Sequence, residues 1–100
     1  MELFTNMNYE TEELVAELID ETITTNIPAK VILFNDEIHS FDDVITQLLI
    51  AIKCTMDQAE ALTWEVHSRG KACVFEGDMP ECLKVSSILE EIDLGTQIEY

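Results

Sequence analysis

Three consecutive polar residues, Asn35, Asp36 and Glu37, follow an apolar run, and a histidine, His67, stands further along the chain. Their side chains supply an amide oxygen, two carboxylates and an imidazole, all of which can accept hydrogen bonds. The apolar spacing before Gly70 places His67 in the last turn of a helix, where unpaired carbonyl groups add a partial negative charge. Together these groups would suit a cation with several N–H donors. The residue types therefore indicate a site for a primary ammonium group.

Simpler interpretations of the same residues remain open. A polar loop after a strand often serves only to make a turn, and a histidine at a helix end often only stabilises that helix. His39 precedes the next helix and is expected to be a solvated loop residue. Trp64 is expected to be a core residue or a partly covered surface ring. Position alone gives neither of these two residues a role.

A catalytic role is less well supported than a binding role. The sequence contains no G-x-S-x-G, no P-loop and no H-x-x-x-H pair. A small acid–base enzyme would use His67 with Asp36 or Glu37, but it would lack an activated nucleophile and a cofactor site. We therefore predict a protein that is not an enzyme and has no catalytic residue, cofactor or metal. A protein–protein interaction domain without a ligand pocket stays open as the alternative, because fold alone does not fix function.

The polar loop is expected to lie between a strand and a helix. The apolar run KVILF, at residues 30–34, is rich in β-branched residues and ends at Asn35, which predicts a buried strand. From Phe41 the apolar residues recur at three- and four-residue spacing, which predicts a helix that extends to about Lys53. Ser40, with Asp43 three residues later, is the predicted cap at the start of this helix. The loop would thus present its polar side chains at the end of a core strand.

A second helix is expected directly after the first. Thr55 and Gln58 have the spacing of a capping box, and the apolar stripe that follows ends before Gly70, a typical residue after a helix C-terminus. This helix would carry His67. The rest of the chain predicts a strand, a turn, a helix and an edge strand, at residues 71–75, 77–78, 79–92 and 96–100.

The element order is β-α-α-β-α-β, which places the chain in the α+β class, with helices layered on a small sheet. Residues 29–100 would form this one domain. Residues 1–28 contain acidic residues but no basic one, so we expect them to be an acidic N-terminal extension. Apolar residues recur at helical spacing within the extension, which is compatible with an amphipathic helix at residues 10–24.

The chain is strongly acidic, because 21 Asp and Glu residues against five Lys and Arg give a net charge of −16. Such a charge repels nucleic-acid phosphates and anionic membrane surfaces, so we expect no nucleic acid and no membrane among the partners. Acidity can also serve solubility alone. Three cysteines without a C-x-x-C pair predict neither a disulfide framework nor a zinc site. We find no export signal and no apolar segment of about eighteen residues, and therefore expect a cytoplasmic protein.

Two stretches within residues 30–72, KVILFNDEIHSFDDVI and QAEALTWEVHSRGKA, pair an N-D-D/E loop with the motif V-H-x-x-G-K. This combination resembles the Clp protease adaptor family called ClpS. The family has a three-stranded antiparallel sheet with three helices and an N-terminal extension, which agrees with the element order above. The remaining residues of the domain resemble the family more loosely.

The resemblance implies an adaptor for proteins whose N-terminal residue is Leu, Phe, Tyr or Trp, known as N-degrons. The family hands these substrate proteins to the AAA+ unfoldase ClpA for degradation by the ClpP peptidase. By resemblance, Asn35 and His67 would bond the α-ammonium group directly. Glu37 would assist through water, Asp36 would shape the loop, and Lys84 would contact the unfoldase. The hydrophobic pocket for the first side chain would be lined by Phe41, Val44, Thr63 and Val66.

Several positions depart from the residues usual in the family. Phe41 and Thr63 stand where many members have methionine, so the pocket would have a larger gate and a smaller wall. His39 replaces the usual threonine, and Ser40 replaces the usual proline. Met79 stands near a position where an acid normally contacts the unfoldase. We therefore expect the preference among Leu, Phe, Tyr and Trp to differ from the common pattern.

Overall fold

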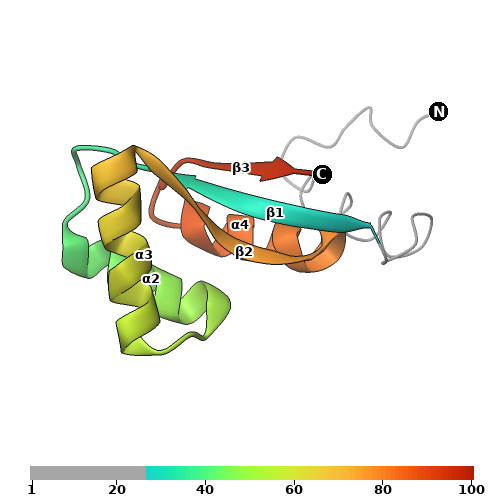
Figure 1. The fold of residues 1–100 in the computed structure, drawn as a ribbon, viewed down its shortest axis with the longest axis horizontal. Coiled ribbons are helices and arrows are strands. Elements are labelled where there is room, and N and C mark those ends of the chain that lie inside the picture. The colour runs from blue at the N-terminus through green and yellow to red at the C-terminus, as the bar shows by residue number, and fades with distance from the viewer. Residues whose placement is uncertain (1–26) are drawn as a thin grey trace.

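A computed structural model of the chain describes residues 27–100 (Figure 1). Three strands and three helices follow one another in the order β-α-α-β-α-β, so the predicted order and the α+β class are confirmed. The predicted helix at residues 10–24 lies outside the described residues. The elements are β1 (Pro28–Phe34), α2 (Phe41–Ile52), α3 (Met56–Arg69), β2 (Lys71–Asp78), α4 (Met79–Glu90) and β3 (Thr96–Glu99).

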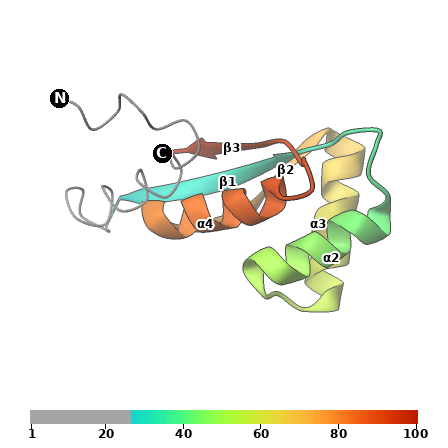
Figure 2. The same ribbon diagram turned by 180° about the vertical axis from the view of Figure 1, so that it is seen from behind.

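The three strands form one antiparallel sheet in the order β2-β1-β3, with β1 at its centre. In this register, Leu33 of β1 pairs with Ala72 of β2 and with Thr96 of β3. Helix α4 runs along one face of the sheet and contacts all three strands (Figures 1 and 2). Helices α2 and α3 pack against each other at one end of the sheet, where β1 leads into the loop that precedes α2 (Figure 2).

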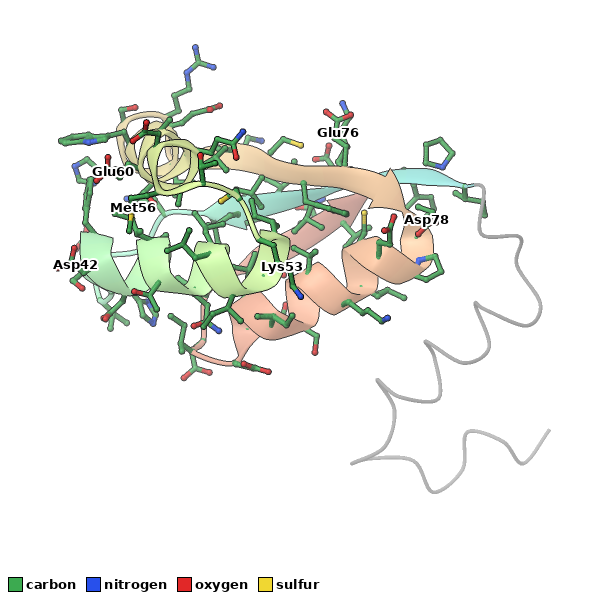
Figure 3. All side chains as sticks on the ribbon, turned by 90° about the horizontal axis from the view of Figure 1, so that it is seen from below. Asp42, Lys53, Met56, Glu60, Glu76 and Asp78 are labelled. Carbon is green, nitrogen blue, oxygen red and sulfur yellow. The ribbon has the colours of Figure 1, made fainter. Side chains whose placement is uncertain are left out.

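The hydrophobic core lies between the sheet and the helices. Val31 and Leu33 of β1, Leu48 of α2 and Leu89 of α4 are fully buried and belong to a single cluster. Charged side chains point outward from the ribbon, as Asp42, Glu60 and Glu76 do in Figure 3. Because α2 is fixed to the core through Leu48, its first turn is held beside the end of β1.

Capping interactions set the helix boundaries that the sequence predicts. The Ser40 hydroxyl accepts a hydrogen bond from the backbone N–H of Asp43 at 3.1 Å and begins α2. Thr55 and Gln58 form both bonds of a capping box at the start of α3. Gly70 ends α3 with φ of +88°, a left-handed conformation that favours glycine. The predicted cap at each of these positions is confirmed.

The predicted turn at residues 77–78 is wrong, because both residues belong to β2. Ala29 pairs with Gly77 and Pro28 with Asp78, so β1 begins two residues before the predicted strand and extends the ladder. No separate turn is needed, since the Asp78 carboxylate accepts the backbone N–H of Glu81 at 3.1 Å and begins α4 directly. The third helix, α4, ends at Glu90, two residues before its predicted end. None of the helices within residues 27–100 has the length and apolar character needed to cross a bilayer.

Candidate functional site

A pocket of about 410 Å³ lies where the loop of residues 35–40 meets the first turn of α2 and the last turns of α3. All eight residues predicted for the site line this pocket. Four are polar: Asn35, Asp36, Glu37 and His67. The other four are Phe41, Val44, Thr63 and Val66. Lys84, which was predicted as a partner contact, is exposed on α4 and does not line the pocket.

The two halves of the polar motif meet because the end of β1 is bonded to the end of α3. The backbone N–H of Asn35 donates to the carbonyl of Gly70 at 2.9 Å. Gly70 in turn donates its N–H to the carbonyl of Val66 at 2.8 Å, as the closing residue of the helix. Asn35 is therefore held within one helical turn of His67. Local helix capping and one contact between strand and helix are enough to assemble the polar rim.

Three polar side chains at the rim are available to a ligand. The side chains of Asn35, Glu37 and His67 are in exposed positions and form no hydrogen bond or ion pair with another residue of the described part, 27–100. An amide oxygen, a carboxylate and an imidazole nitrogen can each accept an N–H bond. An α-amino group has an ordinary pKa near 8 and is largely protonated at neutral pH, with three donors to satisfy. The rim can therefore satisfy an α-ammonium group.

Asp36 differs from its neighbours because its carboxylate is used inside the loop. Its Oδ1 accepts the backbone N–H groups of Ile38 at 3.0 Å and His39 at 2.9 Å. Its Oδ2 lies 2.7 Å from Nδ1 of His39. These bonds, led by the backbone N–H of His39, hold the pKa of the Asp36 carboxyl below its ordinary value. This geometry favours the role of shaping the loop for Asp36.

The expectation that His39 is a solvated loop residue is wrong. Its side chain is only 12% exposed, and both ring nitrogens have partners: Nδ1 faces Asp36, and Nε2 faces the backbone carbonyl of Ile92. The hydrogen bond to Asp36 is the main cause that raises the pKa of His39 above its ordinary value. The three-residue spacing of Asp36 and His39 was the available sequence signal. No sequence signal indicated the contact with Ile92, because this residue lies in a distant segment of the chain.

The floor and walls of the pocket are apolar. Thr63 and Val66 of α3 are buried, while Phe41 and Val44 of α2 are half-buried. The Thr63 hydroxyl donates to the carbonyl of Ala59 at 2.7 Å, so it needs no acceptor from a ligand. The pocket can therefore receive an apolar side chain without leaving a buried polar group unpaired.

An aromatic cluster lies beside the pocket, where Phe41 and His67 line it and Trp64 contacts both rings. The ring centroid of Phe41 lies 4.7 Å from that of Trp64 and 5.2 Å from that of His67, both in edge-to-face geometry. Trp64 and His67 lie 6.1 Å apart, also edge to face. Trp64 is 60% exposed, so it is a surface ring covered only in part by Phe41 and His67. Its place beside the pocket was not predicted.

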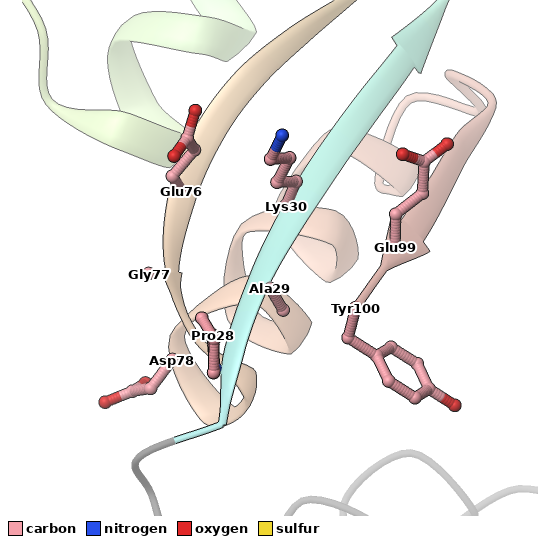
Figure 4. Close-up of a pocket in the computed structure, with 8 residues that line it drawn as sticks. All are labelled: Pro28, Ala29, Lys30, Glu76, Gly77, Asp78, Glu99 and Tyr100. Carbon is pink, nitrogen blue, oxygen red and sulfur yellow. The ribbon is translucent and has the colours of Figure 1, made fainter.

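A larger hollow, of about 770 Å³, lies at the other end of the sheet (Figure 4). Lys30 stands there between Glu76 and Glu99, its cross-strand neighbours, and all three project from the same face (Figure 4). None of the predicted site residues lines this hollow. The smaller pocket combines unpaired acceptors with an apolar wall, so we regard it as the candidate site. Within residues 27–100, no three His, Cys, Asp or Glu side chains are grouped to hold a metal ion.

Comparison with known proteins finds a family match over most of the chain. The family described as ATP-dependent Clp protease adaptor protein ClpS matches residues 24–94. A solved structure of Agrobacterium tumefaciens ClpS2 bound to L-phenylalaninamide is similar, with a TM-score of 0.65 and 20% sequence identity. The similarity covers 74% of this chain and 96% of that one. At this level of identity the comparison shows the same fold.

Two curated relatives are E3 ubiquitin-protein ligases. UBR2 of Homo sapiens is 35% identical over 57 residues, and ubr-1 of Caenorhabditis elegans is 38% identical over 53 residues. These matches cover 57% and 53% of this chain, but the chain spans only 3% of the length of either ligase. The similarity is therefore to one small part of each ligase.

Proposed function

Because the chain belongs to the ClpS family of Clp protease adaptors, we propose that it binds proteins through a free N-terminus that carries a bulky apolar residue. The observation that carries this proposal is the convergence of unpaired acceptors on Asn35, Glu37 and His67 above an apolar pocket of about 410 Å³. The acceptors would bind the α-ammonium group, and the pocket would receive the first side chain. L-phenylalaninamide, the ligand of the similar ClpS2 structure, has both of these features.

Each part of the site contributes to the choice of ligand in its own way. Charged and polar acceptors distinguish a free α-ammonium group from an acetylated one, because acetylation removes the charge and two of the three donors. The apolar wall favours Leu, Phe, Tyr and Trp over charged first residues, since a charged side chain would lose its hydration inside the pocket. Together they define the substrate class as N-degron proteins.

We further propose that the adaptor delivers these substrates to a ClpA-type unfoldase of a ClpAP protease in the cytoplasm. The exposed Lys84 on α4 is the proposed contact, and residues 1–28 are the proposed extension that engages the unfoldase. Met79 does not serve as a surface contact, because it is buried at the start of α4. The docking surface on this chain therefore differs from the family's usual pattern at that position.

Fluorescence anisotropy with four labelled peptides tests the binding proposal. The peptides begin with Phe, Leu, Arg and acetylated Phe and are otherwise identical. We expect the free Phe and Leu peptides to bind, and the Arg and acetyl-Phe peptides to bind far more weakly. Failure of all four to bind would support the alternative, an interaction domain without an N-degron pocket. Equal binding of Phe and acetyl-Phe would show that the rim does not recognise the ammonium group.

Thr63 is the residue we propose to set the depth of the pocket. Thr63 is buried and lines the pocket, so a methionine there would occupy part of the space for the first side chain of the ligand. Overfilling a packed apolar site costs about 1–3 kcal/mol. We expect Thr63→Met to weaken the binding of a Trp peptide by about 10-fold and to weaken the binding of the Leu peptide by a smaller factor. Anisotropy with four peptides beginning Leu, Phe, Tyr and Trp measures this change.

Thr63→Val is the matched control, since it keeps the size of the side chain and removes the hydroxyl that is bonded to Ala59. Its order of preference should match that of the wild type. If Thr63→Met weakened the binding of all four peptides by the same factor, this would contradict a role for Thr63 in selecting the first side chain.

A further inference from the structure

The loop that carries Asn35 and Glu37 has no regular secondary structure, so its shape depends on side-chain bonds. Within the loop, Asp36 accepts two backbone N–H groups and faces His39. Beyond the loop, His39 reaches the carbonyl of Ile92, in the turn between α4 and β3. We call these three residues, Asp36, His39 and Ile92, the His39 bridge. It links one wall of the pocket to a segment 53 residues away.

The two partners of the His39 ring are both acceptors. One is a carboxylate oxygen and the other a backbone carbonyl oxygen, and neither carries a proton to donate. A neutral imidazole has only one N–H, so it can satisfy one of these partners and must present a lone pair to the other. Both contacts are hydrogen bonds only when both ring nitrogens are protonated. The geometry therefore requires the imidazolium form.

We infer that a positively charged His39 positions the N-terminus-binding loop by bridging Asp36 to the carbonyl of Ile92. His39 acts through the loop, so it is a positioning residue that does not itself bind the ligand's ammonium group. This role rests on the proposed function, although the charge of His39 follows from the bridge geometry alone. The bridge also neutralises Asp36, which leaves Glu37 as the carboxylate at the rim without a partner among residues 27–100.

The surroundings of His39 favour the charged form. The side chains of His39 and Asp36 are 12% and 27% exposed, so their ion pair is partly shielded from water. Asp43, in the first turn of α2, adds a second negative charge near the ring. Burial opposes the charge, but the Asp36 bond is the larger effect, and the pKa of His39 is raised overall. The groups that face the ring are thus Asp36 from the loop, Asp43 from α2 and the carbonyl after α4.

The pH dependence of the bridge has a definite sign. A raised pKa in the folded state means that His39 contributes stability below its ordinary value of about 6.5 and loses that contribution as pH rises through the raised value. The lowered pKa of Asp36 means that its contribution is present above its ordinary value and is lost as pH falls through the lowered one. Both groups are charged between the lowered pKa of Asp36 and the raised pKa of His39. A pH above the raised pKa of His39 breaks the bridge, because one ring nitrogen then presents a lone pair to an acceptor.

The charge of His39 is tested by nitrogen NMR of the full chain. The ring signals of His39 and His67 are distinguished with the variant His39→Gln. At pH 6.5 we expect both ring nitrogens of His39 to carry protons, with coupling across the bond to Asp36. A neutral tautomer of His39 at this pH would overturn the inference. This measurement does not depend on peptide binding, so it tests the charge of His39 even if the proposed function is wrong.

The positioning role is tested by the ratio of peptide dissociation constants for His39→Gln and wild type between pH 6 and pH 9. Deprotonation of the peptide's own α-amino group affects both proteins equally and cancels in this ratio. At pH 6 we expect His39→Gln to bind the free Phe peptide about 3- to 10-fold more weakly, since one charge-assisted bond is lost. The ratio should fall towards one as the pH rises through the raised pKa of His39, because the wild-type bridge is then also broken.

Ile38→Ala is the matched control, because this side chain lies in the same loop and is 86% exposed. It should bind as the wild type does at every pH. Thermal unfolding of each variant verifies that it is folded. A ratio that stays constant from pH 6 to pH 9, or that stays at one throughout, would overturn the positioning role. If wild type itself fails to bind the peptide, the proposed function fails, and backbone hydrogen exchange of the loop in His39→Gln tests the bridge instead.

Discussion

Replacing His67 with alanine should weaken binding of a free Phe peptide by about 10- to 100-fold. A hydrogen bond to a charged group contributes about 1.5–3 kcal/mol, and the His67 ring is one of the acceptors at the rim that have no hydrogen-bond partner among the described residues. Every 1.4 kcal/mol is a tenfold change in the dissociation constant. The effect should fall on all free N-termini alike, because the ammonium group is common to them. Fluorescence anisotropy with the Phe and Leu peptides measures it.

Alanine at this position also removes a ring that contacts Phe41, so a second variant is needed to separate the two effects. His67→Phe keeps an aromatic ring beside Phe41 and loses the nitrogen acceptor, and we expect it to bind as weakly as His67→Ala. Ser68→Ala changes the neighbouring exposed residue of α3 and should bind as the wild type does. If His67→Phe retained full affinity, the ring would serve only as a wall and would not bind the ammonium group.

The largest loss of stability is expected from a cavity in the core under α2. Leu48 is fully buried within the main cluster, so Leu48→Ala should lower the free energy of unfolding by about 3 kcal/mol. In a domain of this size, such a loss lowers the melting temperature by more than about 10 °C. Urea unfolding followed by circular dichroism measures the change.

The same helix offers a matched control for the core variant. Ile50→Ala also removes a large aliphatic side chain, but Ile50 is 51% exposed and its loss leaves no enclosed cavity. We expect Ile50→Ala to lower the free energy of unfolding by less than about 1 kcal/mol, because alanine is also the better helix former. Equal destabilisation by Leu48→Ala and Ile50→Ala would show that burial does not decide the cost at these positions.

Local chemistry allowed much of the fold to be predicted, whereas the residues of the site were predicted mainly from the resemblance to the ClpS family. The caps at Ser40, Thr55 and Gly70 depend on residues within three or four positions, so the sequence pattern was sufficient to place the helix ends. Asn35 and His67 come together through a short path, since α3 ends where β2 begins and β1 pairs with β2. The family resemblance paired these two residues before the structure was known, and the structure supplies the physical reason why they meet.

The errors concern interactions between distant segments. The continuation of β2 through residues 77–78 depends on β1 beginning at Pro28, and no pattern within β2 indicates this pairing. The burial of His39 depends on the carbonyl of Ile92, a backbone group that every residue type supplies. Sequence patterns report which side chains can form a bond. They do not report which distant backbone group a side chain will meet.

The chain contains a single tryptophan, Trp64, which contacts two residues that line the pocket, Phe41 and His67. Indole emission shifts to shorter wavelengths when the ring leaves water, and a ring that is 60% exposed has room for such a shift. The intrinsic fluorescence of the unlabelled chain should therefore report on ligand binding at the proposed site.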